Sequence, residues 1–294
     1  MRVKYAFICG EEGNYPIDKM CLWAKVSRSG YYEWHGRGPS SSALRRRRLS
    51  ALVQWSFQDS DGTYGYRRVQ AHLARLGQYA DPETIRVLMR ELGLVACQPR
   101  PWRPTTTVAG DASSTPDLVC RDFTCDTPAT KLVGDITYIK SWEGWLYLAT
   151  VLDCNTKQVV GYAMADHLRT SLIIDALTMA SQRITIRTGI TIFHSDRGCQ
   201  YTSQEFADFA DSLGIRRSLG RTGTCYDNAW AESFNGTLKN ERVNRTVYPT
   251  REHARIDISR YIELRYNQKR LHSALGYITP NEAAQTWLRQ NQAA

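Results

Sequence analysis

The chain has 294 residues and a formal net charge of +9, from 38 basic and 29 acidic residues. A hydrophobic share of 42% is enough to build a packed core, and it excludes wholesale disorder. The positive excess favours a polyanionic partner, most often nucleic acid, over the alternative of a basic enzyme with another kind of substrate.

The sequence contains eight cysteines, with no C-x-x-C pair and no histidine spacing that would complete a zinc site. We interpret them as reduced thiols of a cytoplasmic protein. The apolar run after Met1 is too short for a signal peptide, and the run from Trp145 to Leu152 is too short to cross a bilayer. We therefore predict cytoplasmic localisation and no membrane partner.

Residues 1–40 predict a helical N-terminal lead-in. Residues 18–25 are compatible with a helix, and VSRSGYYEW at 26–34 is typical of a turn followed by a short aromatic-rich helix. The sequence leaves open whether this lead-in is simply a packing arm. The GRGPSSS segment at 36–42 then predicts a linker.

Residues 44–100 predict an all-α region with three helices. In the third helix we expect Asp81 as N-cap, Pro82 at the first helical position and Gly93 just beyond the end. Two short helices with a tight join in a basic setting predict a helix-turn-helix-like DNA-binding region. The expected apolar positions in the three helices are Leu49, Leu52, Val53 and Phe57; Val69, Leu73 and Leu76; and Ile85, Leu88, Met89 and Leu92.

Arginines are prominent in this region. We expect Arg86 and Arg90 on the outward side of the third helix, where they could contact DNA. Two further groups could contact phosphates, although an ordinary solvated helix face is the alternative for them. These two groups are Arg45, Arg46, Arg47 and Arg48, and Arg67 and Arg68.

Prolines among serines and threonines predict a linker over residues 101–130. From 131 to 285 the pattern changes to α/β. Strands are expected near 132–140, 145–153, 158–166, 191–196 and 215–219, with helices near 171–187 and 206–213. Helices over 226–243, 250–270 and from 279 follow. This order predicts a mixed five-stranded sheet with flanking helices, beginning with an antiparallel hairpin that turns near 142–144.

Three acids stand out in this second region. Asp135 lies inside a predicted strand, Asp196 at the end of another and Glu232 inside a predicted helix. If the two strands are neighbours, their acids lie close enough to share ions. Oxygen ligands of this kind suit Mg²⁺ or Mn²⁺, and two ions together can stabilise the attacking and leaving oxygens of a phosphoryl transfer. We predict a catalytic metal site at these acids.

The predicted helix around Glu232 also offers polar side chains. Asn228, Asn235 and Lys239 share one side with Glu232 by helical spacing, so we expect them to contact DNA near the scissile bond. The segment 221–228 before this helix predicts a mobile loop over the site, and Asp227 is a possible N-cap.

Two other polar residues near the acids have open roles. Asp153 follows the second predicted strand, and it could tune the metal site or start a turn, with the turn favoured. His194 could assist proton transfer, but a structural hydrogen-bonding role is favoured.

The motifs around the three acids resemble a known family. DITYI around Asp135, HSDRGCQYTS around Asp196 and DNAWAESFNGTLKNE around Glu232 resemble the DDE signature of retroviral-integrase-like transposases, and 35 residues separate the last two acids, as in that family. YNQKRLHSALGYITPNEA from Tyr266, with VSRSGYYEW and GYRRVQAHL near the N-terminus, resembles the OrfB-type subunit of bacterial insertion-sequence transposases.

The resemblance implies an RNase H-like core with Mg²⁺-dependent catalysis by Asp135, Asp196 and Glu232, and an end-DNA contact by Lys239. It implies DNA cleavage and strand transfer at the ends of an insertion sequence, with water or a DNA 3′-hydroxyl as nucleophile. The expected partners are element ends, target DNA, further copies of the chain, and an upstream-frame OrfA-type partner or fusion. Two other interpretations stay open, a DNA-binding regulator without catalysis and an RNase H-type nuclease.

Overall fold

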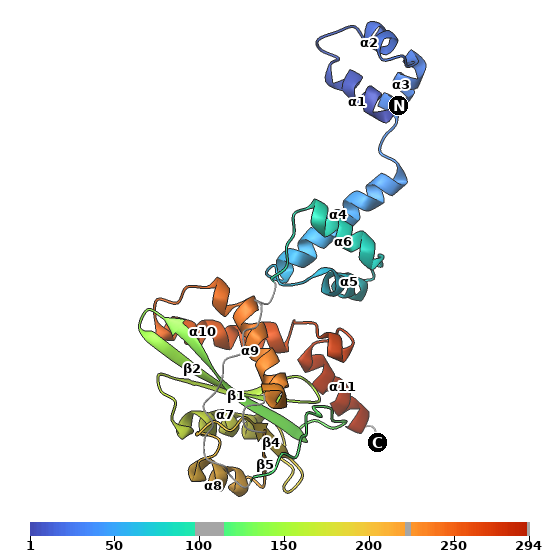
Figure 1. The fold of residues 1–294 in the computed structure, drawn as a ribbon. Helices are drawn as coiled ribbons and strands as arrows, with labels where there is room; N and C mark the ends of the chain where they lie inside the picture. The colour runs from blue at the N-terminus through green and yellow to red at the C-terminus, as the bar shows by residue number, and fades with distance from the viewer. Residues whose placement is uncertain (98–114, 221–224, 293–294) are drawn as a thin grey trace.

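The computed structural model describes residues 1–97, 115–220 and 225–292 (Figure 1). The chain begins with the short helices α1 (Arg2–Gly10), α2 (Ile17–Trp23) and α3 (Arg28–Gly36). They enclose a small core of their own, so the helical character expected for the lead-in is confirmed, with α1 as an addition. The buried residues of this core are Tyr5, Ile8, Met20, Cys21 and Tyr31.

A second helical group follows, made of α4 (Ser41–Asp59), α5 (Tyr66–Arg75) and α6 (Pro82–Glu91). The expected start of α6 is confirmed, because the Asp81 side chain accepts hydrogen bonds from the backbone N–H groups of Glu83 and Thr84. The apolar stripes meet in one core that includes Val53, Val69, Leu73, Ile85, Leu88 and Met89. Leu76 is an exception: it lies at the C-terminal end of α5 and remains 51% exposed.

The predicted mixed five-stranded sheet is confirmed, with the strand order β3-β2-β1-β4-β5. The hairpin pairs β1 with β2 and β2 with β3 antiparallel, whereas β4 lies parallel to β1 and to β5. Residues 142 and 143 form the turn of the first hairpin, since Ser141 pairs with Gly144. The strands are β1 (Lys131–Ser141), β2 (Gly144–Asp153), β3 (Val159–Ala165), β4 (Ile192–Ser195) and β5 (Arg216–Leu219).

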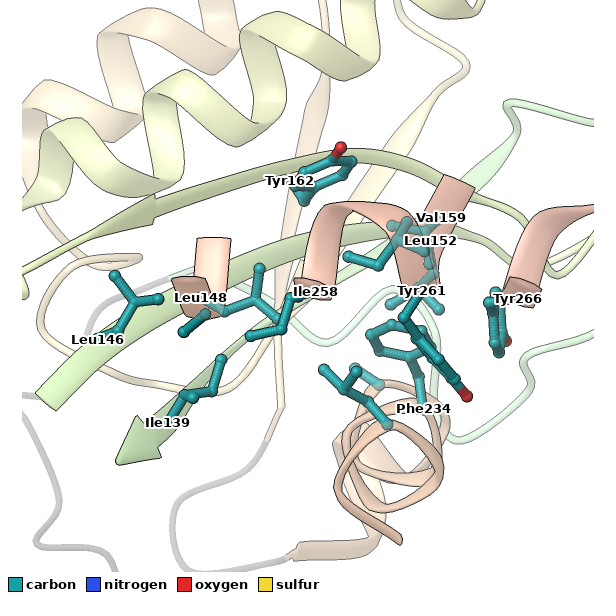
Figure 2. Close-up of a cluster of buried hydrophobic side chains, with 14 of the residues drawn as sticks. Ile139, Leu146, Leu148, Leu152, Val159, Tyr162, Phe234, Ile258, Tyr261 and Tyr266 are labelled. Atoms are coloured by element: carbon teal, nitrogen blue, oxygen red, sulfur yellow. The ribbon is translucent and has the colours of Figure 1, made fainter. Parts of the chain in front are cut away.

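Helices cover both faces of this sheet. Helices α7 (Thr170–Arg183) and α8 (Gln204–Ser212) pack on one face, in a core that includes Leu132, Val151 and Phe193. Helices α9 (Ala229–Glu241) and α10 (Arg251–Arg260) pack on the other face. Figure 2 shows this second core, in which side chains of β1 and β2 meet Phe234, Ile258 and Tyr261.

Helix boundaries near the C-terminus differ in part from the prediction. The 3₁₀ turn η1 (Cys225–Asn228) precedes α9, and Asp227 binds Arg121 at 2.7 Å instead of capping the helix. After α9 comes the 3₁₀ turn η2 (Val243–Arg245), and α10 continues as the π-helical segment η3 (Tyr261–Asn267). The 3₁₀ turn η4 (Ser273–Leu275) leads to α11 (Pro280–Gln292). As expected, α11 starts at the TPNE segment, where Thr279 and Glu282 bind each other's backbone N–H groups.

The helical group α4–α6 packs against the C-terminal segment of the chain. The Tyr64 hydroxyl donates to the Lys269 carbonyl at 3.1 Å and accepts from the Leu271 N–H at 2.8 Å. Leu271 is also part of the core of α4–α6. Hydrophobic contact and hydrogen bonds therefore join residues about 200 positions apart, and they anchor this helical group to the sheet domain.

The expected linker over 101–130 lies partly outside the described residues, as does the first half of the loop expected over 221–228. Residues 115–130 contain turns and no regular element. Within the described ranges, no helix is both long and apolar enough to cross a membrane.

Candidate active site

Asp135 lies on the central strand β1, on the face that α9 covers. Val133 and Ile139 point into the core beneath α9 and α10, and side chains alternate along a strand, so Asp135 shares their face. Its carboxylate accepts hydrogen bonds from the Ile136 N–H at 2.9 Å and from the Asn235 amide at 2.8 Å. These two bonds orient the carboxylate toward α9.

Asp196 follows directly after the last residue of β4. The parallel register ends with the pair of Val133 and His194, and each acid lies two residues further along its chain. The Asp196 carboxylate accepts a hydrogen bond from the Gly198 N–H at 3.0 Å. The parallel pairing of β1 and β4 therefore brings the two acids close enough for the charge of Asp196 to raise the pKa of Asp135.

Glu232 lies in the first turn of α9 and is exposed at the surface. Helix α9 crosses the face of the sheet that carries Asp135, since Ala231 and Phe234 pack in the same core as Val133. The acids thus come from a strand, a strand end and a helix, and they face one region of the molecule.

The three carboxyl groups influence one another electrostatically. Burial and the charge of Asp196 raise the pKa of Asp135 to about 7. Burial raises the pKa of Asp196. Glu232 is exposed as a residue, but partial desolvation of its carboxyl group raises its pKa, and the charge of Asp196 adds to this. Like charges held together in a partly desolvated place cost free energy, and a bound cation would remove that cost.

The donor set fits a hard divalent cation. Carboxylate oxygens are the ligands that Mg²⁺ and Mn²⁺ prefer, and no thiol or imidazole belongs to the three-acid group. The Oδ1 atom of Asn235, beside Asp135, is buried without a hydrogen-bond partner, so a further oxygen acceptor adjoins the acids. Oxygen donors of this kind are the ones that a hard divalent cation prefers.

The side chains of Asn228 and Asn235, which were expected to face DNA, point toward the sheet. Both are buried, and both donate to β1: Asn228 to the Gly134 carbonyl at 3.1 Å and Asn235 to Asp135. Their amides hold α9 against the strand, because this side of α9 faces the sheet. Lys239 is half-buried on α9. Burial lowers the pKa of Lys239, and the nearby charge of Asp135 partly opposes this shift.

His194 has a structural place. It is fully buried, with Nδ1 2.8 Å from the Ser218 hydroxyl and Nε2 2.8 Å from the Asp227 carbonyl. Burial lowers the pKa of the His194 imidazole, which favours its neutral form. Because both ring nitrogens are engaged, the structure matches the favoured structural role.

Asp153 pairs across the hairpin with Leu132 and is not opposite Asp135. Its carboxylate accepts from the Thr156 hydroxyl at 2.7 Å and from backbone N–H groups of the turn that follows β2. The structure therefore places Asp153 in the turn, the role that the sequence favoured.

The arginines of the helical region lie at the surface. Arg86 and Arg90 are exposed on α6, and the run Arg45–Arg48 is exposed on α4. Arg86 forms a pair with Glu83 at 2.8 Å, and Arg46 forms a pair with Glu91 at 2.7 Å. Exposed pairs of this kind are screened by solvent and contribute little stability.

Two residues pack beneath the acids in a way that the sequence analysis did not predict. Phe193 on β4 packs over Gly134, where an added Cβ would lie 2.3 Å from the Phe193 ring. Tyr201 is fully buried, packs edge-on against Phe206, and senses the charges of Asp135 and Asp196. A glycine directly before a strand acid was the available signal for such close packing.

The chain matches known families over both of its regions. The integrase core domain family matches residues 126–225, a second integrase core domain family matches residues 213–280, and the HTH-like domain family matches residues 44–102. The last match agrees with the helix-turn-helix-like region expected from the sequence.

Curated relatives align over most of their length. An uncharacterized 31 kDa protein of insertion element IS600 from Shigella sonnei is 38% identical over 261 residues, which are 89% of this chain and 96% of the relative. The transposase InsF for insertion sequence IS3A from Escherichia coli is 34% identical over 282 residues, which are 95% of this chain and 98% of the relative.

Among solved structures, the HTLV-2 integrase catalytic core domain in complex with magnesium resembles 53% of this chain and 96% of that chain, at 19% identity and a TM-score of 0.42. A similarity at this level adds nothing to the assignment, which depends on the sequence relatives and family matches. On those grounds the chain belongs to the insertion-sequence transposases that include InsF, with an RNase H-like integrase core and an HTH-like DNA-binding region.

Proposed function

We propose that this transposase uses Asp135, Asp196 and Glu232 to bind one or two divalent cations, Mg²⁺ or Mn²⁺, for DNA cleavage and strand transfer. The observation that supports this proposal is that β1, the end of β4 and α9 place three carboxyl groups near enough for their charges to interact, and each has a raised pKa. Bound cations would stabilise the attacking and leaving oxygens during phosphoryl transfer.

In this proposal the protein side chains bind the cations and the DNA and hold the elements of the site in position. The carboxylates provide the ligands, and Asn228 and Asn235 hold α9 in place against β1. Lys239 would pair with a phosphate of the end DNA, because it lies on α9 near Asp135. The nucleophile is water for cleavage or a DNA 3′-hydroxyl for strand transfer, so no protein group forms a covalent intermediate.

The decisive experiment is strand transfer with a labelled duplex from the end of the element and Mg²⁺. We expect Asp196→Asn to abolish product, while Asp208→Asn, which removes an exposed acid on α8, leaves it unchanged. Equal product from Asp196→Asn and the original chain would contradict the proposal. An RNA–DNA hybrid tested alongside would be cleaved in preference to the element end if the chain were an RNase H-type nuclease.

We also propose an organisation with a lead-in at 1–40, DNA binding at 44–100, a linker at 101–130 and catalysis at 131–285. Surface contacts with DNA are proposed for Arg86, Arg90 and the run Arg45–Arg48, which are all exposed. The active form is expected to be a homo-oligomer, because transposition joins two element ends. The expected localisation is the cytoplasm. An OrfA-type upstream partner remains part of this proposal.

A further inference from the structure

Helices α1–α3 form a unit that lies outside both the proposed catalytic site and the region matched by the HTH-like domain family, so neither gives it a role. Helix α2 ends at Trp23 and α3 begins at Arg28, so residues 24–27 join them. The turn is held by Val26, whose N–H donates to the Cys21 carbonyl at 3.0 Å, and it contains Lys25 at a φ of 51°. Two short helices joined by such a turn have the arrangement of a helix-turn-helix.

Helix α1 fixes the orientation of this pair. A Cβ on Gly30 would lie 2.6 Å from the Tyr5 hydroxyl oxygen, so α3 packs closely against α1 at this point. Lys4 donates to the Ala24 carbonyl at 2.7 Å, which ties the turn to α1. Tyr31 of α3 is fully buried between these elements, so packing fixes the position of α3.

The outward face of α3 carries hydrogen-bond donors. Ser27 caps the helix by accepting a hydrogen bond from the Gly30 N–H at 3.0 Å. Arg28, Ser29 and Tyr32 are exposed in the first turns of α3, beyond the cap. A guanidinium and two hydroxyls are groups that bind base edges and phosphates.

The basic side chains near this face are exposed and could contact a ligand. Within the described ranges neither Lys25 nor Arg28 forms an ion pair, and both are exposed. Glu33, the one acid of α3, forms its pair with Arg37 at the other end of the helix, at 2.6 Å. The start of α3 therefore combines unneutralised basic side chains with the positive end of a helix dipole, which suits a polyanion.

We propose that α2 and α3 form a second helix-turn-helix, which places the first turns of α3 in the major groove of double-stranded DNA. Arg28, Ser29 and Tyr32 then make its base and phosphate contacts. Figure 1 shows α1–α3 beyond the end of α4, away from the sheet. The contacted DNA segment is therefore separate from the one at the three acids, and the inference does not depend on the metal chemistry.

The test measures binding of the full chain to a duplex from the element end, with EDTA present so that no cleavage occurs. We expect Arg28→Ala to weaken binding ~10-fold, as for loss of one good base contact. Hydroxyl-radical footprinting should show one protected segment lost, while protection by the rest of the chain remains. Arg28→Lys should retain part of the affinity, which separates loss of contact from loss of folding.

The matched control is Arg37→Ala, which removes the same charge just beyond the C-terminal end of α3, away from the proposed contact. We expect it to keep the original affinity and footprint. If Arg28→Ala and Arg37→Ala give the same affinity and the same footprint, whether both are weak or both are strong, the second helix-turn-helix is excluded. Binding here is measured apart from strand transfer, so failure of one proposal leaves the other standing.

Discussion

Asn235 on α9 donates a hydrogen bond of 2.8 Å to the Oδ2 atom of Asp135 on β1. This bond joins the helix that carries Glu232 to the strand that carries the first acid. A carboxylate held by such a neighbour keeps its orientation toward a cation, and loss of an outer hydrogen bond of this kind typically costs ~10–100-fold in metal affinity or activity.

We therefore predict that Asn235→Ala lowers the rate of strand transfer about 10-fold and raises the Mg²⁺ concentration needed for half-maximal rate. Binding of the element end without metal should stay the same. The measurement is a Mg²⁺ titration of strand transfer, with Asn240→Ala on the same helix as control. An unchanged Mg²⁺ dependence for Asn235→Ala would show that the hydrogen bond does not position Asp135.

A second prediction follows from the pKa of Asp135, which burial and the charge of Asp196 raise to about 7. The folded protein holds this proton more tightly than the unfolded chain, so ionisation of Asp135 costs stability as pH rises from about 4 to about 7. We expect metal-free Asp135→Asn to melt at a higher temperature than the original chain at pH 8.

The melting-temperature difference between these two proteins should shrink as pH falls and vanish near pH 4, where both side chains are neutral. Added Mg²⁺ should raise the melting temperature of the original chain and leave Asp135→Asn unchanged, because ligand binding stabilises the folded state. A difference that is independent of pH would mean that the charge of Asp135 is not the cause.

Glu241 at the end of α9 forms a buried ion pair with Arg270, with 2.9 Å between Oε1 and Nη2 and side chains that are 4% and 6% exposed. Arg68 on α5 approaches the same carboxylate at 3.8 Å. We predict that Glu241→Gln lowers the free energy of unfolding by ~3–5 kcal/mol, because Arg270 would stay buried without its countercharge.

The matched control for this change is Glu83→Gln, which breaks the exposed pair with Arg86 on α6. It should alter the unfolding free energy little, since exposed pairs are screened by solvent. Urea denaturation of both variants measures the difference. If the two substitutions were equally mild, the Glu241 pair would not hold α9 and the α4–α6 group together.

Gly134 supports Asp135 by leaving space for a neighbouring ring. We predict that Gly134→Ala lowers stability by ~1–3 kcal/mol and reduces strand transfer, because the new methyl group overlaps the Phe193 ring and displaces the strand beside Asp135. Gly236→Ala is the control: nothing lies within 4 Å of its Cβ position on α9, so it should be neutral or slightly stabilising. Equal stability of both variants, measured by thermal unfolding, would refute this packing argument.

Much of the fold could be predicted because local patterns agree with the final packing. The cap at Asp81 and the reciprocal bonds of Thr279 and Glu282 formed as expected, since such contacts span only a few residues. The five strands were found from apolar periodicity for the same reason. The role of Asp227 was not found, because its partner Arg121 is about 100 residues away.

The sequence by itself determined the order of strands and helices, the three acids and the family, since each depends on residue identity and spacing along the chain. The direction in which the helix side with Asn228 and Asn235 points was decided only by tertiary structure. Helical spacing shows which side chains share a face, but packing on the sheet decides what that face meets. Likewise, the pairing of β1 with β4 brings Asp135 near Asp196, and that pairing exists only once strands distant in sequence lie side by side.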